Sequence, residues 1–197
     1  MSERITGILL AAGSSARFGA PKLLATLANG VAVGMQSAEA MAPHVDDLLV
    51  VLRPGDSALE RLFSAREFRI TIAPDAAAGM GHSLAHAVRC SSASAAWLVG
   101  LADMPFVAAT TMRALCHELR NGAKLVAPFY RDRRGNPVGF SCRYKDELEG
   151  LTGDQGARQI LRRDRAEIVR VGVSDPGIFS DIDRPSDLPG SCSADQT

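Results

Sequence analysis

Short apolar runs alternate with longer amphipathic stretches along most of the chain. Seven runs have the length of a strand, and we predict strands at residues 5–11, 47–52, 68–73, 95–101, 123–128, 137–141 and 167–171. The first, second and fourth runs are apolar without alternation, which is typical of strands buried on both faces of a sheet. Five stretches between the runs have helical periodicity, at residues 34–41, 56–64, 81–90, 108–119 and 155–162.

The alternation of strand and helix predicts an α/β fold class. We expect a single Rossmann-like three-layer domain with a mostly parallel mixed sheet and right-handed crossovers. No internal repeat or linker is visible, so residues 1–189 are interpreted as one domain and 190–197 as a flexible C-terminal tail. A last short helix is expected from Pro185 to Asp187.

Polar clusters follow the first, third and fourth predicted strands. They occupy residues 12–22, 74–83 and 103–105. Ligands of open α/β sheets bind beyond the carboxyl ends of the strands. We therefore expect these three loops to converge on one crevice.

Composition narrows the classes of ligand. Twenty-two Lys and Arg residues balance 22 Asp and Glu residues, so no basic field points to nucleic acid or to an anionic membrane. The four cysteines are far apart and form no C-x-x-C pair, so we expect reduced thiols rather than a zinc site or disulfides. No apolar run approaches the roughly 18 residues that span a bilayer. The first run leads directly into a polar loop and is interpreted as a strand, not a signal peptide, and a cytoplasmic location is expected.

The segment "LLAAGSSARFGAPKLL" (residues 9–24) follows the first predicted strand. Gly13 leaves backbone N–H groups open to an anion, and Arg17 and Lys22 add two cations. The segment matches neither G-x-x-x-x-G-K-[ST] nor G-x-G-x-x-G. By residue type alone it is either an anion-binding loop or an ordinary turn with two solvated basic residues.

The order of residues in this loop resembles the signature L-A-A-G-x-S-x-R-[MF]-G-x-x-K of the MobA-like nucleotidyltransferases. The matching positions are Leu10, Ala11, Ala12, Gly13, Ser15, Arg17, Phe18, Gly19 and Lys22. Further segments resemble later motifs of that family: "AAGMGHSL" (77–84), "LADMP" (101–105), "RRGNPVGF" (133–140), "TGDQGARQIL" (152–161) and "DIDRPSDL" (181–188). The resemblance spans residues 4–188 and implies a fold of the nucleotide-diphospho-sugar transferase type.

The chain is most similar to the MocA-type molybdenum cofactor cytidylyltransferases of this family. Ala12 stands where the guanylyltransferases have glycine, and the G-M-x-x-S-L and G-D-x-G-A-R segments are present. Phe18 replaces the usual methionine. Gly81 stands where a serine or a larger polar residue is common in the family, and Asn136 replaces a histidine that is often seen in the R-G-H-P segment. The last departure lies on the acceptor side of the motif series.

The resemblance implies Mg²⁺-dependent transfer of CMP from CTP to molybdopterin, the organic part of the molybdenum cofactor, with release of pyrophosphate. The product would be a dinucleotide cofactor, with a molybdenum hydroxylase as a possible partner enzyme. By the same resemblance, Arg17, Lys22 and Asp103 are the catalytic candidates. The nucleotide-binding candidates are Leu10, Ala11, Ala12, Gly13, Arg17, Lys22, Gly79 and Ser83. Asp103 and Asp183 are the metal candidates, with Asp181 as the alternative to Asp183.

Other interpretations stay open at this point. A guanylyltransferase, or a cytidylyltransferase for another phosphorylated metabolite, would need the same residues, and a non-catalytic cofactor carrier would not need a metal aspartate. His82 and His86 have the i, i+4 spacing of a metal pair, but no third ligand is near, so they are interpreted as a partly exposed helix face. The run "RDRR" (residues 131–134) is either a solvated charge run or a contact for an anionic acceptor. The acceptor and the oligomeric state stay undetermined.

Overall fold

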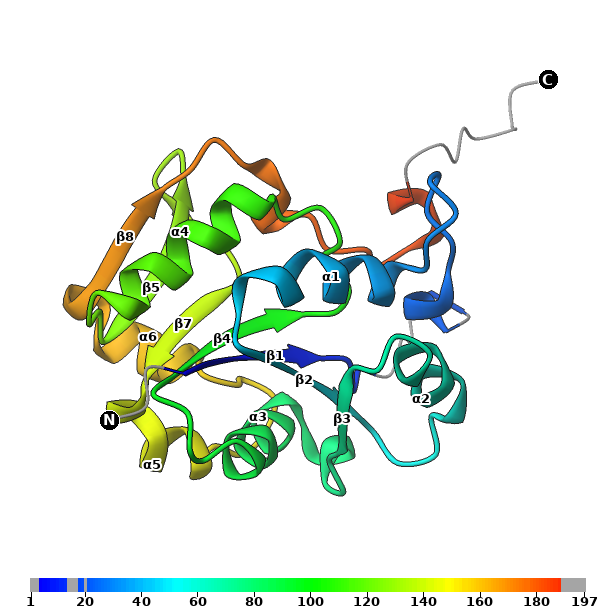
Figure 1. Cartoon of the computed structure of the whole chain (residues 1–197), viewed down its shortest axis with the longest axis horizontal. Helices are drawn as coiled ribbons and strands as arrows, with labels where there is room; N and C mark the ends of the chain where they lie inside the picture. Colours follow the sequence, from blue (N-terminus) through cyan, green and yellow to red (C-terminus); the bar gives the residue numbers. More distant parts are fainter. Residues whose placement is uncertain (1–3, 14–17, 20, 189–197) are drawn as a thin grey trace.

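The computed structural model describes residues 4–13, 18–19 and 21–188, and in this part of the chain eight strands form one mixed sheet (Figure 1). The strands are β1 (Ile5–Leu10), β2 (Asp47–Leu52), β3 (Arg69–Ile72), β4 (Ala96–Leu101), β5 (Leu125–Tyr130), β6 (Arg133–Arg134), β7 (Val138–Ser141) and β8 (Ile168–Gly172). Their order is β3-β2-β1-β4-β7-β5-β6, and β8 pairs with β5.

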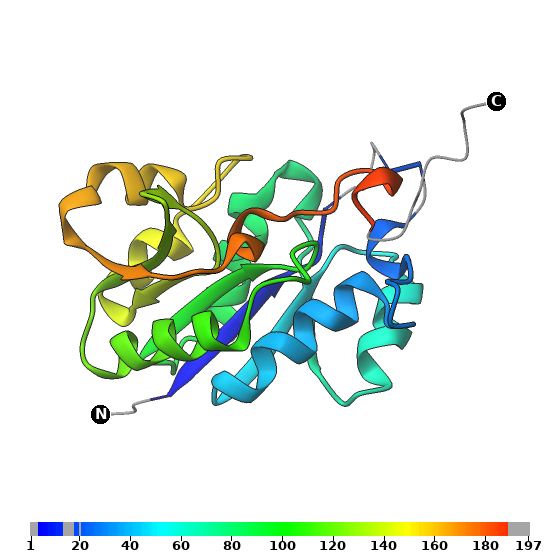
Figure 2. The same ribbon diagram turned by 90° about the horizontal axis from the view of Figure 1, so that it is seen from above.

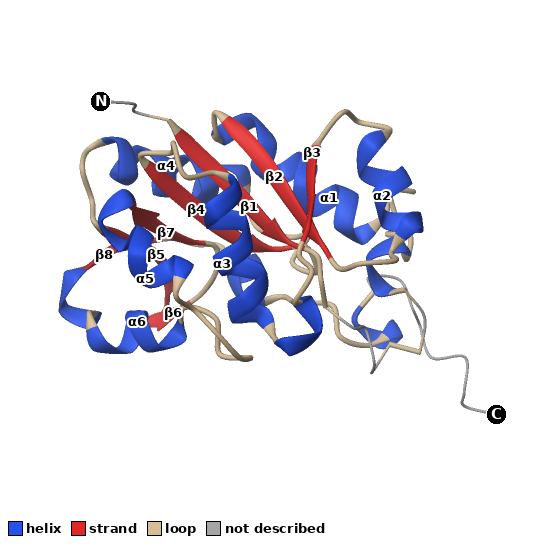
Figure 3. Cartoon of the chain, turned by 90° about the horizontal axis from the view of Figure 1, so that it is seen from below, coloured by secondary structure: helices blue, strands red, loops and turns tan. Residues whose placement is uncertain are grey.

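Helices cover both faces of this sheet. They are α1 (Val33–Met41), α2 (Ser57–Ser64), α3 (Met80–Cys90), α4 (Ala109–Arg120), α5 (Lys145–Glu149) and α6 (Arg158–Arg163). Buried side chains of α1, α2 and α4 belong to one hydrophobic cluster, and those of α3, α5 and α6 to a second. Figure 3 shows α3, α5 and α6 on the near side of the strands, whereas Figure 2 looks onto α1 and α4. The predicted three-layer α/β domain is therefore confirmed.

Strand β2 shows why a continuous apolar run forms a central strand. Successive side chains of a strand point to opposite faces. Leu48, Val50 and Leu52 pack in the α1–α2–α4 cluster, and Leu49 and Val51 pack in the α3–α5–α6 cluster. Both faces are buried, so no polar position interrupts the run.

Strand direction decides which loops meet. Strand β1 is parallel to β2 and β4, and β2 is parallel to β3, so the carboxyl ends of these four strands lie at one edge of the sheet. Strand β7 runs antiparallel between β4 and β5. Its amino end, preceded by the cis peptide Asn136–Pro137, therefore lies at that same edge. The β5–β6 hairpin also lies there, because β5 is parallel to β4.

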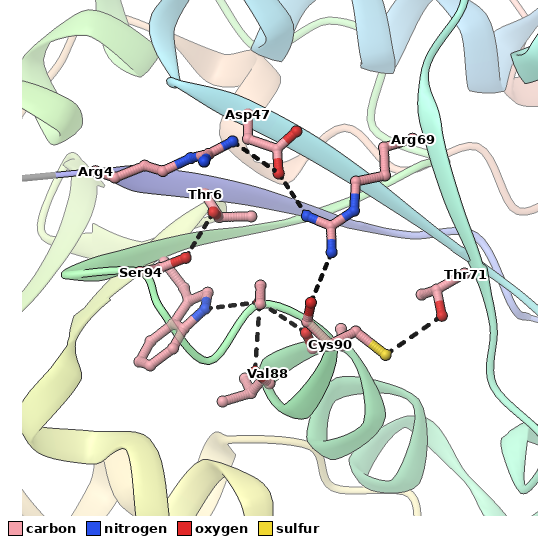
Figure 4. A network of polar contacts seen from close by, with 11 residues as sticks. Arg4, Thr6, Asp47, Arg69, Thr71, Val88, Cys90 and Ser94 are labelled. Carbon is pink, nitrogen blue, oxygen red and sulfur yellow. Dashed lines mark hydrogen bonds and ion pairs between the residues drawn. The ribbon is translucent and has the colours of Figure 1, made fainter. Parts of the chain in front are cut away.

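The opposite edge of the sheet is closed by a polar network (Figure 4). Asp47 Oδ2 accepts a hydrogen bond from Arg69 at 2.6 Å and pairs with Arg4 at 3.4 Å. Arg69 also donates to the carbonyl of Cys90 at the end of α3, at 2.6 Å. These contacts tie the amino ends of β1, β2 and β3 to α3, away from the loops at the carboxyl edge.

The short elements differ most from the prediction. Helix α6 begins at Arg158 rather than at residue 155, since Gly153 and Gly156 both have positive φ before it. Helix α5 and strand β6 were not predicted. No helix in the described ranges is both long and apolar enough to cross a membrane.

Candidate functional site

A cavity of about 830 Å³ opens at the carboxyl edge of the sheet. It is lined by Leu10, Ala11, Ala12, Gly13, Lys22, Leu23, Arg53, Pro54, Pro74, Ala76, Ala77, Gly79, Met80, Ser83, Leu101, Asp103, Asp154 and Asp183. About half of these residues lie directly after β1, β2, β3 or β4. The three predicted loops do converge, and loops from the C-terminal third of the chain join them.

Lys22, Asp103 and Asp183 meet at one point of this cavity. Lys22 Nζ donates to Asp103 Oδ2 at 2.6 Å and to Asp183 Oδ1 at 3.1 Å. The lysine is 9% exposed and sits in a single 3-10 turn, Lys22–Leu24, whose Leu23 is buried in the core. Burial acts to lower the pKa of Lys22, but the hydrogen bonds and negative charges of Asp103 and Asp183 outweigh it, so the pKa is raised.

The backbone explains how two aspartates 80 positions apart come together. Asp103 follows β4, and its carbonyl accepts a hydrogen bond from the Ile182 N–H at 2.9 Å. The Ile182 side chain is buried, which fixes the segment. Asp183 N–H donates in turn to Asp187 Oδ2 at 2.9 Å, in the short Pro185–Asp187 turn. Of the two acids considered from the sequence, Asp183 lines the cavity and Asp181 is exposed.

The second loop contributes Gly79 and Ser83, and it is covered by residues 152–154. The Gly81 N–H donates to the Gly153 carbonyl at 2.8 Å, and the Gly153 N–H donates to His82 Nδ1 at 3.2 Å. A Cβ at Gly81 would lie 2.6 Å from the Thr152 carbonyl oxygen, so only glycine allows this approach. This close approach is a physical reason why position 81 has a glycine where a serine or a larger polar residue is common in the family signature. It also means that the Gly81 amide is occupied and is not open to an anion.

The opening loop is described only in part. Leu10, Ala11, Ala12 and Gly13 line the cavity, and their contact with a nucleotide stays a prediction. Arg17 lies outside the described residues, so its predicted role stays a prediction.

Two charged cavity residues, Arg53 and Asp154, were not among the sequence candidates. Arg53 follows β2 directly and pairs with Asp56 at 3.3 Å. Its position directly after a buried apolar run is the sequence signal that could have identified Arg53 as a site residue. Asp154 reaches the cavity because residues 152–154 pack on the start of α3, a tertiary contact without a local sequence pattern.

The structure shows the surroundings of the histidine pair and of the arginine run that the sequence analysis singled out. His82 accepts from Gly153, whereas His86 Nε2 lies 2.8 Å from Thr71 Oγ1, so each ring has its own partner. All four residues of the arginine run are exposed, and Arg133 and Arg134 form the short strand β6. The Arg133 guanidinium lies over the Phe179 ring at 4.5 Å. Burial, followed by the charges of Arg158 and Arg162, lowers the pKa of Arg134.

The aspartates fit a divalent cation. Their two oxygens converge on one cation already, at 2.6 and 3.1 Å from the same nitrogen. Within residues 4–13, 18–19 and 21–188, no group of three His, Cys, Asp or Glu side chains is placed to hold a metal. A cation here would take its other ligands from phosphate and water, which is how Mg²⁺ usually binds beside nucleotides.

Comparison with known proteins identifies relatives along nearly the whole chain. The family model of the MobA-like NTP transferase domain matches residues 7–168. The purine catabolism protein PucB of Bacillus subtilis (strain 168) is 31% identical, over 94% of this chain and 95% of its own. The nicotine blue oxidoreductase of Paenarthrobacter nicotinovorans is 26% identical, over 91% of this chain and 92% of its own.

Solved structures match equally broadly. Rv0371c from Mycobacterium tuberculosis H37Rv is 26% identical, with a TM-score of 0.80 over 93% of this chain and 94% of its own. Its complex with manganese matches with a TM-score of 0.73 over 86% and 88%. A CMP:2-keto-3-deoxy-manno-octonic acid synthetase solved with CTP is 11% identical, with a TM-score of 0.74 over 94% and 95%, a likeness of fold alone. The fold is thus that of the nucleotide-diphospho-sugar transferases, as predicted.

Proposed function

The chain belongs to the MobA-like NTP transferase domain family, and from this premise we propose that it transfers CMP from CTP to molybdopterin, as part of the molybdenum cofactor, and releases pyrophosphate. The observation that carries the proposal is the convergence of Lys22, Asp103 and Asp183 on the wall of a nucleotide-sized cavity. Such a cluster supplies the charges that the reaction of two phosphate groups requires.

In the proposed reaction, a phosphate oxygen of the acceptor attacks the α-phosphorus and pyrophosphate leaves. Both reactants are anions, so alignment and charge neutralisation supply most of the catalysis. The attacking oxygen is already ionised, and no general base is needed. Lys22 would hold the triphosphate, and Arg17 would meet the charge that grows on the leaving pyrophosphate.

Asp103 and Asp183 would hold a divalent cation. Mg²⁺ or Mn²⁺ bound there offsets the charge of the triphosphate oxygens and orients them. The manganese complex of Rv0371c supports a divalent cation in a structure of this type. We propose Mg²⁺ for this chain.

The choice of base is proposed from Ala12. Ala12 lines the cavity together with Ala11, and cytosine has one ring where guanine has two. We therefore propose CTP rather than GTP. The gain from excluding a larger base by one methyl group is modest.

The acceptor side is proposed from the β5–β6 hairpin. The hairpin lies at the same edge as Asp103, and the nearby charges of Arg158 and Arg162 act on Arg134. Clustered guanidinium groups suit a phosphate monoester, which molybdopterin carries. A molybdenum hydroxylase that receives the product is the proposed partner.

The test is incubation with molybdenum cofactor, Mg²⁺ and each of four nucleoside triphosphates, with the product identified by mass and pyrophosphate measured in parallel. CMP transfer supports the proposal, and a GMP adduct would assign the chain to guanylyltransferases instead. Cofactor binding without pyrophosphate release would indicate a carrier. An oxidoreductase, the activity in the name of the second relative, would release no pyrophosphate either.

A further inference from the structure

Lys22 occupies the very point at which Asp103 and Asp183 converge. Its ammonium is within 3.1 Å of both carboxylates and is nearly inaccessible to solvent. A divalent cation bound by the same two oxygens would have to sit where this nitrogen sits. Two cations cannot share that point, because like charges a few ångströms apart repel strongly.

We propose that Lys22 is a built-in counter-ion which occupies the metal site until nucleotide arrives, so that metal entry requires the lysine to move onto the triphosphate. The inference rests on the proposed function, because it takes Asp103 and Asp183 as the metal ligands. It adds a second role for Lys22 besides phosphate binding.

The local structure allows the side chain to move while its backbone stays in place. The turn is held by the Leu24 N–H donating to the Pro21 carbonyl at 2.9 Å and the Ala25 N–H donating to the Lys22 carbonyl at 3.1 Å. Leu23 anchors it in the core. The lysine stem itself is flexible and its ammonium is a point charge without directional demands, so it can exchange carboxylate for phosphate oxygens.

The exchange makes metal and nucleotide bind cooperatively. Triphosphate would draw the ammonium away from both carboxylates, and Asp103 and Asp183 would then be able to hold a divalent cation in its place. Each ligand removes a cost that the other would meet alone, so each raises the affinity of the other by the same factor. Free metal alone is expected to bind weakly, because the binding-competent form is a minor one.

The experiment is a titration of the full chain with Mn²⁺ in the absence of nucleotide, followed by electron paramagnetic resonance of the unbound ion. If the lysine-bound form outweighs the open form about ten to one, Lys22→Met should bind Mn²⁺ about tenfold more tightly than the wild type. Lys22→Met/Asp103→Asn should lose this gain. Lys124→Met removes an equal charge from an exposed pair with Glu167 and should leave Mn²⁺ binding unchanged.

Equal or weaker Mn²⁺ binding by Lys22→Met overturns the inference. Lys22→Gln keeps a hydrogen-bond donor without the charge and serves in its place should the methionine variant not fold; it too should bind Mn²⁺ more tightly. A larger rise of Tm on addition of Mn²⁺ in the variants than in the wild type is the second readout. Pyrophosphate release by the wild type in the same preparations reports separately on the proposed function. Failure of the inference about Lys22 can therefore be distinguished from failure of the proposed function.

Discussion

At the residue scale, Asp103 has two separate contacts. Its carboxylate holds Lys22, and its backbone carbonyl holds Ile182. Asp103→Asn changes only the first. We expect turnover to be abolished, because the metal loses an anionic oxygen, while the free energy of unfolding falls by only about 1 kcal/mol. Pyrophosphate release in Mg²⁺ and a urea titration measure both, and near-full activity would exclude Asp103 as a metal ligand.

Arg17 is expected to act on the chemical step more than on nucleotide affinity. Its proposed contact strengthens as charge develops on pyrophosphate, so the contact contributes chiefly in the transition state. Arg17→Ala should lower kcat by about 10²–10³ with a smaller change in KM. An effect confined to the KM for CTP would show that Arg17 binds only the ground state.

Ala12 is expected to contribute to the choice of base. Ala12→Gly makes room for a second ring and should shift the ratio of kcat/KM for CTP and GTP toward GTP by about 1–3 kcal/mol at most. The ratio is measured for wild type and variant under the same Mg²⁺ concentration. A wild-type preference for GTP would contradict both the choice of CTP and this account of Ala12.

How far single residues were predictable depends on where their signal lies. Lys22, Asp103, Gly79 and Ser83 carry motif positions, and the structure brings all four to one cavity. Asp154 had a motif but no assigned role, since its place on the wall depends on residues 152–154 packing against Gly81. That contact joins segments about 70 positions apart, which no local pattern indicates.

At the scale of elements, Asp175 links α4 to the segment that carries Asp183. Its buried carboxylate accepts hydrogen bonds from the Ala108 N–H at 2.9 Å, the Thr111 hydroxyl at 2.7 Å and the Gly177 N–H at 2.9 Å. Asp175→Ala leaves these donors unpaired in the interior. We expect a loss of about 2–4 kcal/mol in the free energy of unfolding, measured by urea titration.

The control for Asp175 is Asp132→Asn. Asp132 is a 95% exposed partner of Arg170 with a φ of 60°, which asparagine also tolerates, so loss of its charge should change stability by less than about 0.5 kcal/mol. Equal stability of both variants would contradict the structural role of Asp175.

The central strands were predictable because burial on two faces leaves a continuous apolar run, as in β2 and β4. The long helices were predictable from the helical periodicity of their apolar residues. The short elements were not. Helix α5 has five residues and buries Leu148 in the cluster that also contains side chains of α3, and β6 has two residues, which pair with Phe129 and Tyr130. Elements of this length are formed by tertiary contacts, and their own sequences carry too little periodicity to be recognised.

At the scale of the whole molecule, the polar contacts that join the strands and the cavity lie at opposite edges of the sheet. The amino ends of β1–β3 are tied by Arg4, Asp47 and Arg69, and the carboxyl ends open into the cavity. The antiparallel insertion of β7 brings the start of that strand, and the β5–β6 hairpin with it, to the cavity edge. Under the proposed function, acceptor and nucleotide would therefore approach the same aspartates from neighbouring strands.

The same whole-molecule view predicts how stability depends on pH. Burial raises the pKa of the Cys116 thiol to about 11, and burial, followed by a hydrogen bond to Asp164, raises the pKa of Tyr144 to about 12. Both groups hold their protons more tightly when folded, so the stability they contribute is fully present below their unfolded pKa values of 9.0 and 10.0. It is lost as the pH rises through about 11 and about 12.

The free energy of unfolding should therefore fall continuously from pH 9 to pH 12, as measured by urea titration at fixed ionic strength. Tyr144→Phe separates the two contributions. The ring keeps its edge-to-face contact with Phe140 at 6.0 Å, and only the hydroxyl and its bond to Asp164 are removed. Its stability should decline less steeply than that of the wild type above pH 10, because the phenylalanine ring has no proton to lose. Parallel curves for the two proteins across this range would show that Tyr144 ionises in the folded state as readily as in the unfolded chain.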